Sequence, residues 1–505
     1  MRSKWRLRDL ESGCLALTCA MALSASAQTA GSQSLAQQVQ QLTDALARTQ
    51  QQLQQSQEQL KQMQDQLDML KRQMAQAAAT NATTPTPAAR LAAQVEQLRE
   101  QQRLQESEIA THDQIKVESG SKYPVKLDGL ILLNGFINTQ QVDMVATPTI
   151  AIGGPGSSGA TLRQTWLGVE ARGPHLFGAS SSGDVSVDFF GSTSPNGNYT
   201  GAYNNSVGLL RLHTAHAALA WKYTRTSFAY DRPILSPNAP DSLTAVAIPP
   251  LAWSGNLWAW NPQLELGHDF PLSSSHSLRL QAALIDVADP PVPAFPPTVP
   301  APPDPASTAE QSRWPGTEAR VAWVSRTSDT AAEFGAGGFF APHRTSFGAS
   351  FDSWAGTLDF RQPLPAHFVL TGAFYRGLAL GGLGGGAYKD FAARPDLDDP
   401  GNIYFRALDD VGGWAELKER LNQRLEFNAA FGLDSVPAGE LRPYAGYSNT
   451  YYQNLARNRT YTGNIIYTPS AYLLFSLEYR RLESSPTSSP TAASNVIGMA
   501  AGYKF

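Results

Sequence analysis

The last eleven residues, 495–505, alternate in polarity with a period of two. One parity is apolar or aromatic throughout: Ile497, Met499, Ala501, Tyr503 and Phe505. Because successive side chains of a β-strand point to opposite faces, this stretch predicts a strand with one wholly apolar face. Soluble chains usually end in polar, frayed residues. A transmembrane β-barrel closes its sheet with such a strand and places the terminal ring at the membrane interface, so we favour a barrel over the edge strand of a soluble sheet.

The same alternation recurs from Val125 onward. We expect sixteen strands, in residues 126–137, 161–172, 184–191, 208–221, 225–231, 257–269, 276–287, 317–326, 332–341, 346–361, 367–378, 404–418, 422–433, 457–468, 471–482 and 495–505. An even number lets an antiparallel barrel begin and end in the periplasm. The first and last strands must then be antiparallel neighbours. No apolar run approaches the ~20 residues of a spanning helix.

The connections between these segments alternate in length. Long gaps follow the odd-numbered strands, at 138–160, 192–207, 232–256, 288–316, 379–403, 434–456 and 483–494, although the gap after the ninth strand is short. Most gaps after even-numbered strands are tight turns, and 173–183 is of moderate length. Long extracellular loops alternating with short periplasmic turns are typical of an outer-membrane barrel and not of a soluble sandwich.

The two faces of the expected strands differ in charge. In 471–482, Leu473, Phe475 and Leu477 oppose Glu478 and Arg480. A charge on the lipid face costs about 2–4 kcal/mol at the bilayer midplane, so the charged parity must face the lumen, which should therefore be polar and hold water. The alternative is the solvated face of a soluble sheet.

The N-terminus has the pattern of a secretory signal. A basic stretch, an apolar stretch from Gly13 to Leu23 and an A-S-A site predict a signal peptide over residues 1–27. Cys14 and Cys19 both lie inside it, which leaves no cysteine for a disulfide or a metal site. The formal net charge of −4 gives no whole-chain reason to expect nucleic acid as a partner.

Residues 28–79 carry a heptad pattern. One core position repeats as Val39, Leu46, Leu53, Leu60, Leu67 and Met74. This predicts a coiled-coil helix that needs partner helices to bury its apolar stripe. A helix lying on a membrane surface is the alternative, which the Gln-rich, non-basic polar face disfavours. Residues 80–124 are predicted to hold a proline-containing linker and a second helix, and 125–505 the transmembrane β-barrel. The expected fold class is all-β: a 16-stranded antiparallel transmembrane β-barrel preceded by an α-helical coiled coil.

Several segments resemble the DcaP-like and phosphate-porin-like trimeric outer-membrane porins, some of which carry an N-terminal periplasmic coiled coil. They are G-P-H-L-F-G at 173–178, D-V-S-V-D-F-F-G at 184–191, L-R-L-H-T-A-H-A at 210–217, S-G-N-L-W at 254–258, and N-R-T-Y, Y-T-P-S and L-E-Y-R within 458–480. The resemblance implies a passive channel, a homotrimer in the outer-membrane lipid of a Gram-negative-type bacterium, and small hydrophilic solutes with a preference for anions. No lysine-rich strand or loop matches a phosphate-selective site.

The candidate site is the long segment after the fifth strand. In porins the third extracellular loop folds inward, and 232–256 occupies that place. Asp231, Arg232 and Asp241 are then expected to line a constriction, where charged groups set selectivity; an ordinary surface loop is the alternative. A basic wall could come from Arg279, Arg320, Arg406, Lys418, Arg424 and Arg480, but Glu318, Glu416, Glu426 and Glu478 lie on the same strands. We therefore expect mutual pairing and weak selectivity.

Other motifs predict little chemistry. His213 and His216 are three apart, which in a regular strand puts them on opposite faces and disfavours a shared metal. Gly381–Gly386 lacks a following Lys-Ser/Thr and is interpreted as a flexible loop. No spacing selects a catalytic triad, so we expect no enzyme, no cofactor and no metal. Three hypotheses remain: a solute channel, a structural tether that reaches the cell wall through the coiled coil, and a barrel enzyme, which is the least favoured.

Overall fold

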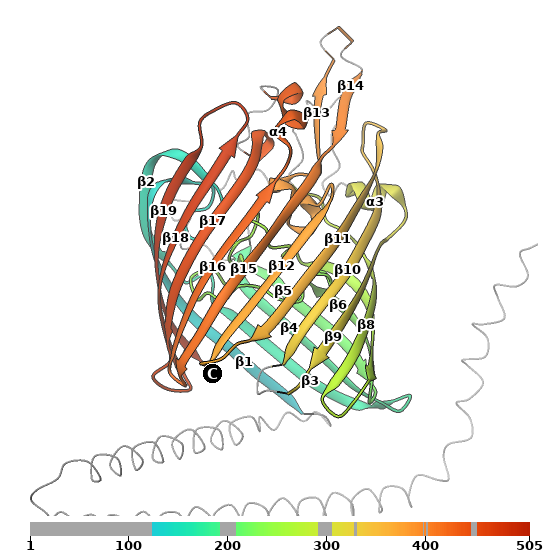
Figure 1. Ribbon diagram of the computed structural model, residues 1–505, viewed down its shortest axis with the longest axis vertical. Coiled ribbons are helices and arrows are strands. Elements are labelled where there is room, and N and C mark those ends of the chain that lie inside the picture. Colours follow the sequence, from blue (N-terminus) through green and yellow to red (C-terminus); the bar gives the residue numbers. More distant parts are fainter. Residues whose placement is uncertain are drawn as a thin grey trace, which may run out of the picture. The chain divides into compact units, whose positions relative to one another are not determined.

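A wall of antiparallel strands dominates the protein (Figure 1). The computed structural model describes residues 124–191, 209–290, 306–327, 331–396, 398–399, 402–445 and 452–505. The predicted signal peptide, coiled coil and second helix fall in residues 1–123, outside the described residues. Among the residues that are described, no helix is both long and apolar enough to cross a membrane.

The wall strands are β1 (Val125–Val142), β2 (Ala151–Thr161), β3 (Trp166–Leu176), β4 (Ala179–Gly191), β5 (Leu209–Ala220), β6 (Thr224–Asp231), β7 (Asn261–Pro271), β8 (His276–Ile285), β9 (Gly316–Ser325), β10 (Ala332–Arg344), β11 (Ser350–Pro363), β12 (Phe368–Leu378), β15 (Asp409–Asn422), β16 (Leu425–Ser435), β17 (Leu455–Tyr467), β18 (Leu473–Pro486) and β19 (Ala492–Lys504). A separate hairpin pairs β13 (Phe391–Pro395) with β14 (Ile403–Ala407). Short helices are α3 (Thr308–Ser312), α4 (Ala438–Leu441), η1 (Gly381–Leu383), η2 (Gly386–Tyr388), η3 (Arg442–Tyr444) and η4 (Tyr452–Asn454).

These seventeen segments fill sixteen strand positions, because β2 and β3 share one. β3 pairs with the first part of β1, from Val125 to Leu130, and β2 pairs with the second part, from Asn134 to Val142. All sixteen expected strands overlap observed ones. The expected loop at 138–160 was wrong, however, because much of it is strand. Strand β2 consists mostly of small residues and shows no apolar alternation from which the strand could be predicted; its sequence is A-I-G-G-P-G-S-S-G-A-T.

The barrel is closed by the first and last strands. β1 and β19 are antiparallel neighbours, with Leu130 opposite Lys504 and Asn138 opposite Val496. The predicted pairing of 126–137 with 495–505 is therefore confirmed. All neighbouring wall strands are antiparallel, and short turns at one end of the barrel alternate with longer connections at the other (Figure 1).

The outer face of the wall is a belt of apolar side chains. Leu358, Leu477 and Met499 are 58%, 53% and 49% exposed. Such a belt is what a wall surrounded by lipid requires, since lipid and lumen residues alternate along each strand. The inner face carries most of the charges, but it is not polar throughout. Near the long-loop end, a buried cluster that includes Ile285, Phe339 and Tyr375 packs against connecting segments.

Candidate functional site

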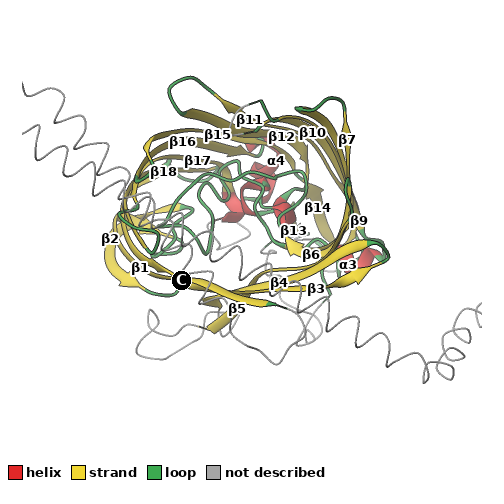
Figure 2. Cartoon of the chain, turned by 90° about the horizontal axis from the view of Figure 1, so that it is seen from below, coloured by secondary structure: helices red, strands yellow, loops and turns green. Residues whose placement is uncertain are grey.

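The connection between β6 and β7, residues 232–260, folds into the barrel, and we call it the inner loop. Viewed along the barrel, loop segments occupy its interior (Figure 2). Leu235, Ser254 and Asn256 of the inner loop are almost completely buried. Leu235 packs in the same interior cluster as Tyr375 of β12, and Ser254 Oγ lies 2.9 Å from Thr460 Oγ1 of β17. The predicted inward fold of the segment after the fifth strand is therefore observed.

Amide side chains of the wall hold the inner loop by its backbone. Gln164, between β2 and β3, donates from Nε2 to the Thr244 carbonyl at 3.0 Å, and its Oε1 accepts from the Val246 amide at 2.7 Å. Asn458 of β17 donates to the carbonyl of Trp253 at 3.0 Å. Since buried backbone groups need partners, these contacts replace the water that an exposed loop would use.

Two glycines, one in a wall strand and one in the inner loop, make room for this contact. A Cβ at Gly432 of β16 would lie 2.1 Å from the Ser254 carbonyl oxygen. A Cβ at Gly255 of the inner loop would lie 2.1 Å from the Gly413 carbonyl oxygen of β15, and Gly255 has a φ of +98°. The loop and the wall thus touch backbone to backbone, and no side chain fits between them.

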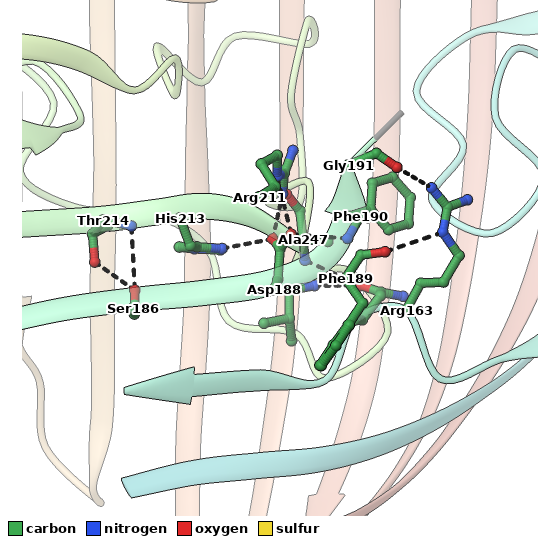
Figure 3. Close-up of polar contacts among 12 residues, drawn as sticks. Arg163, Ser186, Asp188, Phe189, Phe190, Gly191, Arg211, His213, Thr214 and Ala247 are labelled. Carbon is green, nitrogen blue, oxygen red and sulfur yellow. Dashed lines mark hydrogen bonds and ion pairs between the residues drawn. The ribbon is translucent and has the colours of Figure 1, made fainter. Parts of the chain in front are cut away.

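One wall of the lumen carries a charged and aromatic cluster from β4 and β5 (Figure 3). The Asp188 carboxylate accepts from Arg211 Nε at 3.1 Å, and its Oδ2 lies 2.9 Å from His213 Nδ1. Arg211 also donates from a terminal nitrogen to the Ala247 carbonyl of the inner loop at 2.7 Å. The Arg163 guanidinium lies 4.6 Å from the ring centre of Phe190.

A β-bulge at His213 puts His216 on the same inward face as His213. The pairing of β4 with β5 shifts between Ser186 and Val187, so that Ser186 faces Thr214 while Val187 faces Leu212. His213 is the extra residue. His216 also points inward, with Nδ1 2.8 Å from Asp184 Oδ2 and Nε2 3.2 Å from Asp231 Oδ2. The expectation that the two histidines lie on opposite faces was wrong, because it assumed a regular strand.

The two histidines nevertheless bind different carboxylates. Within the part of the chain that the structure describes, no group of three or more His, Cys, Asp or Glu side chains is placed to hold a metal ion.

A second part of the lumen, between the inner loop and β11, β12 and β15, holds an open cavity of about 900 Å³. Its charged lining comes from Arg232, Asp241, Arg361, Glu416, Lys418 and Arg420. Lys418 Nζ forms an ion pair with Asp241, and the Asp241 amide donates to Glu416 Oε1 at 2.7 Å. Burial lowers the pKa of the Arg232 guanidinium. Cations and carboxylates therefore share this cavity.

The other basic residues predicted for the lumen are paired as well. Arg320 contacts Asp359 at 2.6 Å and Glu333 at 2.7 Å. Arg279 contacts Asp269 at 2.8 Å. Arg480 contacts Glu478 at 2.5 Å, and Glu478 in turn accepts from Thr244 of the inner loop at 2.7 Å.

Two of the expected wall residues lie elsewhere. Arg406 belongs to β14, in the hairpin beyond the wall, and pairs with Glu440 at 2.6 Å. The sequence pattern predicts one strand over 404–418 and so puts Arg406 in the wall, whereas the wall strand β15 begins only at Asp409. Arg424 lies in the short turn between β15 and β16.

The connection after β12 also enters the barrel. Its glycine-rich part, predicted to be flexible, forms η1 and η2 and is buried. A Cβ at Gly384 would lie 2.8 Å from the Trp258 amide nitrogen of the inner loop, so the two loops are in backbone contact. Trp253 of the inner loop stacks on Tyr388 with ring centres 3.9 Å apart. Both loops therefore lie inside the barrel and contact each other.

A buried lysine anchors this second loop. Lys389 Nζ donates to the carbonyls of Ala387 at 2.8 Å and Leu455 at 2.6 Å. Burial lowers the pKa of Lys389 to about 7. Asp434 of β16 accepts from the Ala387 amide at 2.8 Å and from the Tyr375 hydroxyl at 2.6 Å.

A closed barrel of sixteen strand positions, with an apolar belt outside and a folded-in loop after the fifth strand, is the architecture of outer-membrane porins. The DcaP channel of Acinetobacter baumannii has this fold: it is 16% identical to this chain, with a TM-score of 0.54, over 76% of this chain and 99% of that one. An anion-selective porin from Comamonas acidovorans matches with 9% identity and a TM-score of 0.46, over 76% of this chain and 100% of that one. OprB of Pseudomonas putida matches with 9% identity and a TM-score of 0.44, over 75% and 94%. No protein-family model and no curated protein matches the chain.

Sequence reasoning missed Arg163, Asp188, Arg211 and His213 as a group. Asp188, Arg211 and His213 lie on expected strands, and Arg211 and His213 share a face, but the pairing that sets Asp188 opposite Arg211 has no signature in the sequence. Arg163 lies in the break between β2 and β3, which alternation placed inside a strand.

Proposed function

We propose that the protein is an outer-membrane porin, a passive diffusion channel for small hydrophilic solutes. The observation that carries the proposal is the inner loop, which lies across the lumen of a closed barrel and is lined by paired charges. A folded-in loop narrows a wide barrel to the size of a small solute and brings charges close to its path. The fold shared with the DcaP channel supports the same function.

The orientation follows from the lengths of the connections. Short turns belong to the periplasmic side and long loops to the extracellular side, so the inner loop enters from outside. Asp231, Arg232, Asp241 and Lys418 then line the constriction, together with the Asp188 cluster on the opposite wall. Because most of these charges are paired, we expect weak selectivity, with anion preference limited to the lysine- and arginine-rich cavity.

Planar-bilayer recording tests the channel. Purified, folded protein should give discrete single-channel steps, and their absence would refute the proposal. The homotrimer belongs to the proposal as well, and a heat-modifiable oligomer on gels would support it.

A tether to the cell wall is a second candidate, favoured by the heptad pattern of residues 28–79. Deletion of residues 28–120 that preserves conductance but weakens the envelope would support it. A barrel enzyme is tested by assays for lipid or peptide hydrolysis.

A further inference from the structure

Strands β17 and β18 reach the long-loop end of the barrel (Figure 1). Toward that end their outer face changes from apolar to charged. On β18 the outward parity begins with Leu473, Phe475 and Leu477 and reaches Tyr479, which is 49% exposed. The next outward residues are Arg481 and Glu483. Aromatic residues mark the membrane interface of such barrels, so the charges lie at the level of the lipid headgroups.

The neighbouring strand repeats the pattern in register. Tyr461 of β17 is 41% exposed and faces Arg481, and Arg459 faces Glu483. Arg457 follows on the same parity and lies between Ser435 of β16 and Ser485 of β18. The charged residues therefore form one patch, which we call the rim patch: Arg457, Arg459, Arg481 and Glu483.

The rim patch carries an excess of positive charge. Glu483 binds both neighbouring arginines, Arg459 at 3.0 Å and Arg481 at 2.8 Å. One carboxylate thus forms ion pairs with two guanidinium groups, which leaves a net positive charge. The exposed Arg457 has no ion-pair partner among the described residues. By contrast, the outward Arg376 elsewhere on the rim has one carboxylate of its own, Asp409, at 3.4 Å.

The arginines are held in place with donors to spare. Arg481 also donates to Asn495 Oδ1 at 3.3 Å, and the Tyr479 hydroxyl donates to the same oxygen at 2.8 Å. A guanidinium that is fixed on one side by a carboxylate keeps its other N–H groups for an acceptor, and its fork geometry matches the oxygens of a phosphate.

We propose that the rim patch binds the phosphate groups of a phosphorylated lipid in the outer leaflet of the membrane. The patch lies directly above the apolar belt, where a lipid whose chains cover the belt must place its headgroup. Phosphate is the anion of such headgroups, and clusters of arginine at the interface recognise it. The proposal depends on the membrane orientation inferred above, but not on conduction of solutes.

Native mass spectrometry of the full chain in detergent tests the binding. The probes are lipid A with two phosphates, the same lipid without phosphates, and inorganic phosphate. We expect retention of the phosphorylated lipid only, reduced about tenfold in the triple variant R457Q/R459Q/R481Q, in which the charge-assisted bonds are lost. Arg376→Gln is the matched control and should retain the lipid. Glu483→Gln should bind more tightly than the native chain, because it removes the competing carboxylate.

Equal retention by the native chain and the triple variant would overturn the proposal. So would equal retention of the lipid without phosphates, or displacement of the lipid by an equal concentration of inorganic phosphate. Dissociation of an oligomer with unchanged lipid binding would make the patch a contact between copies and would equally overturn it. Single-channel steps should be unchanged in the triple variant, which separates this proposal from the channel.

Discussion

Phe505 and Gly129 exchange two backbone hydrogen bonds, each of 3.1 Å. These bonds join residue 505 to the first part of β1. The ring of Phe505 also covers Gly129: a Cβ at that position would lie 2.8 Å from the end of the ring. Barrel closure therefore depends on the absence of a side chain at residue 129.

Gly129→Val is expected to weaken closure. The added side chain meets Phe505, the Trp166 carbonyl and Leu167, and overpacking of this kind costs about 1–3 kcal/mol. The fraction of protein that runs as folded, heat-modifiable barrel on gels should fall, and the urea midpoint should drop. Gly356→Val is the matched control, because a Cβ there meets nothing within 4 Å. Equal loss in both variants would contradict the closure model.

Gly432→Val is expected to displace the inner loop without opening the barrel. Its side chain would collide with the Ser254 carbonyl and with Leu251. Because the wall can still close, the variant should remain heat-modifiable, while single-channel conductance rises and becomes noisier. Gly463→Val in β17 serves as the control, since a Cβ there lies 3.8 Å from its nearest neighbour, the Asn428 carbonyl oxygen. Unchanged conductance in the Gly432 variant would mean that the inner loop does not limit flow.

Period-two alternation predicted the wall well because lipid imposes it: every outward side chain from Ile497 to Phe505 must be apolar, and the sequence records that requirement. The same constraint does not act on β2, where small residues lie in the strand without an apolar stripe. It does not act on the hairpin of β13 and β14 either, which extends beyond the wall (Figure 1). Arg406 belongs to this hairpin and therefore not to the wall.

The interior was harder to predict, because its contacts join residues far apart in the chain. The place of the inner loop could be inferred from its position after the fifth strand. Its partners could not: Gln164 and Asn458 are almost 300 residues apart, and both hold its backbone. The glycines at 381–386 look flexible in sequence, yet they are glycines because backbone packs on backbone there.

Lys418→Gln and Asp241→Asn are expected to shift ion selectivity in opposite directions. The two side chains form an ion pair in the lined cavity, so removing either leaves the other charge uncompensated. A unit charge about 4 Å from a passing ion changes its energy by about 1 kcal/mol in water, which is about fivefold in occupancy. Reversal potentials in a salt gradient should move toward cations for the Lys418 variant and toward anions for the Asp241 variant. Arg376→Gln, on the outer face, should leave the reversal potential unchanged. A shift of the same sign in both variants would exclude the pair from the conduction path.

The pH dependence of stability should reveal the buried Lys389. Its pKa is lowered to about 7 by burial, below the 10.5 of an exposed lysine. Between these values the unfolded chain binds more protons than the folded chain, so the free energy of unfolding should rise with pH, by up to about 1.4 kcal/mol per pH unit, and level off below pH 7. Lys389→Met removes the titrating group and should abolish this rise, although it leaves the Leu455 carbonyl without its donor. Thermal unfolding in detergent between pH 7 and 10 measures the difference between the two proteins. If the unfolding temperatures of both change in parallel over this range, Lys389 is not held in a water-excluded site, and the second loop does not pack against β16 and β17 as tightly as the lysine contacts require.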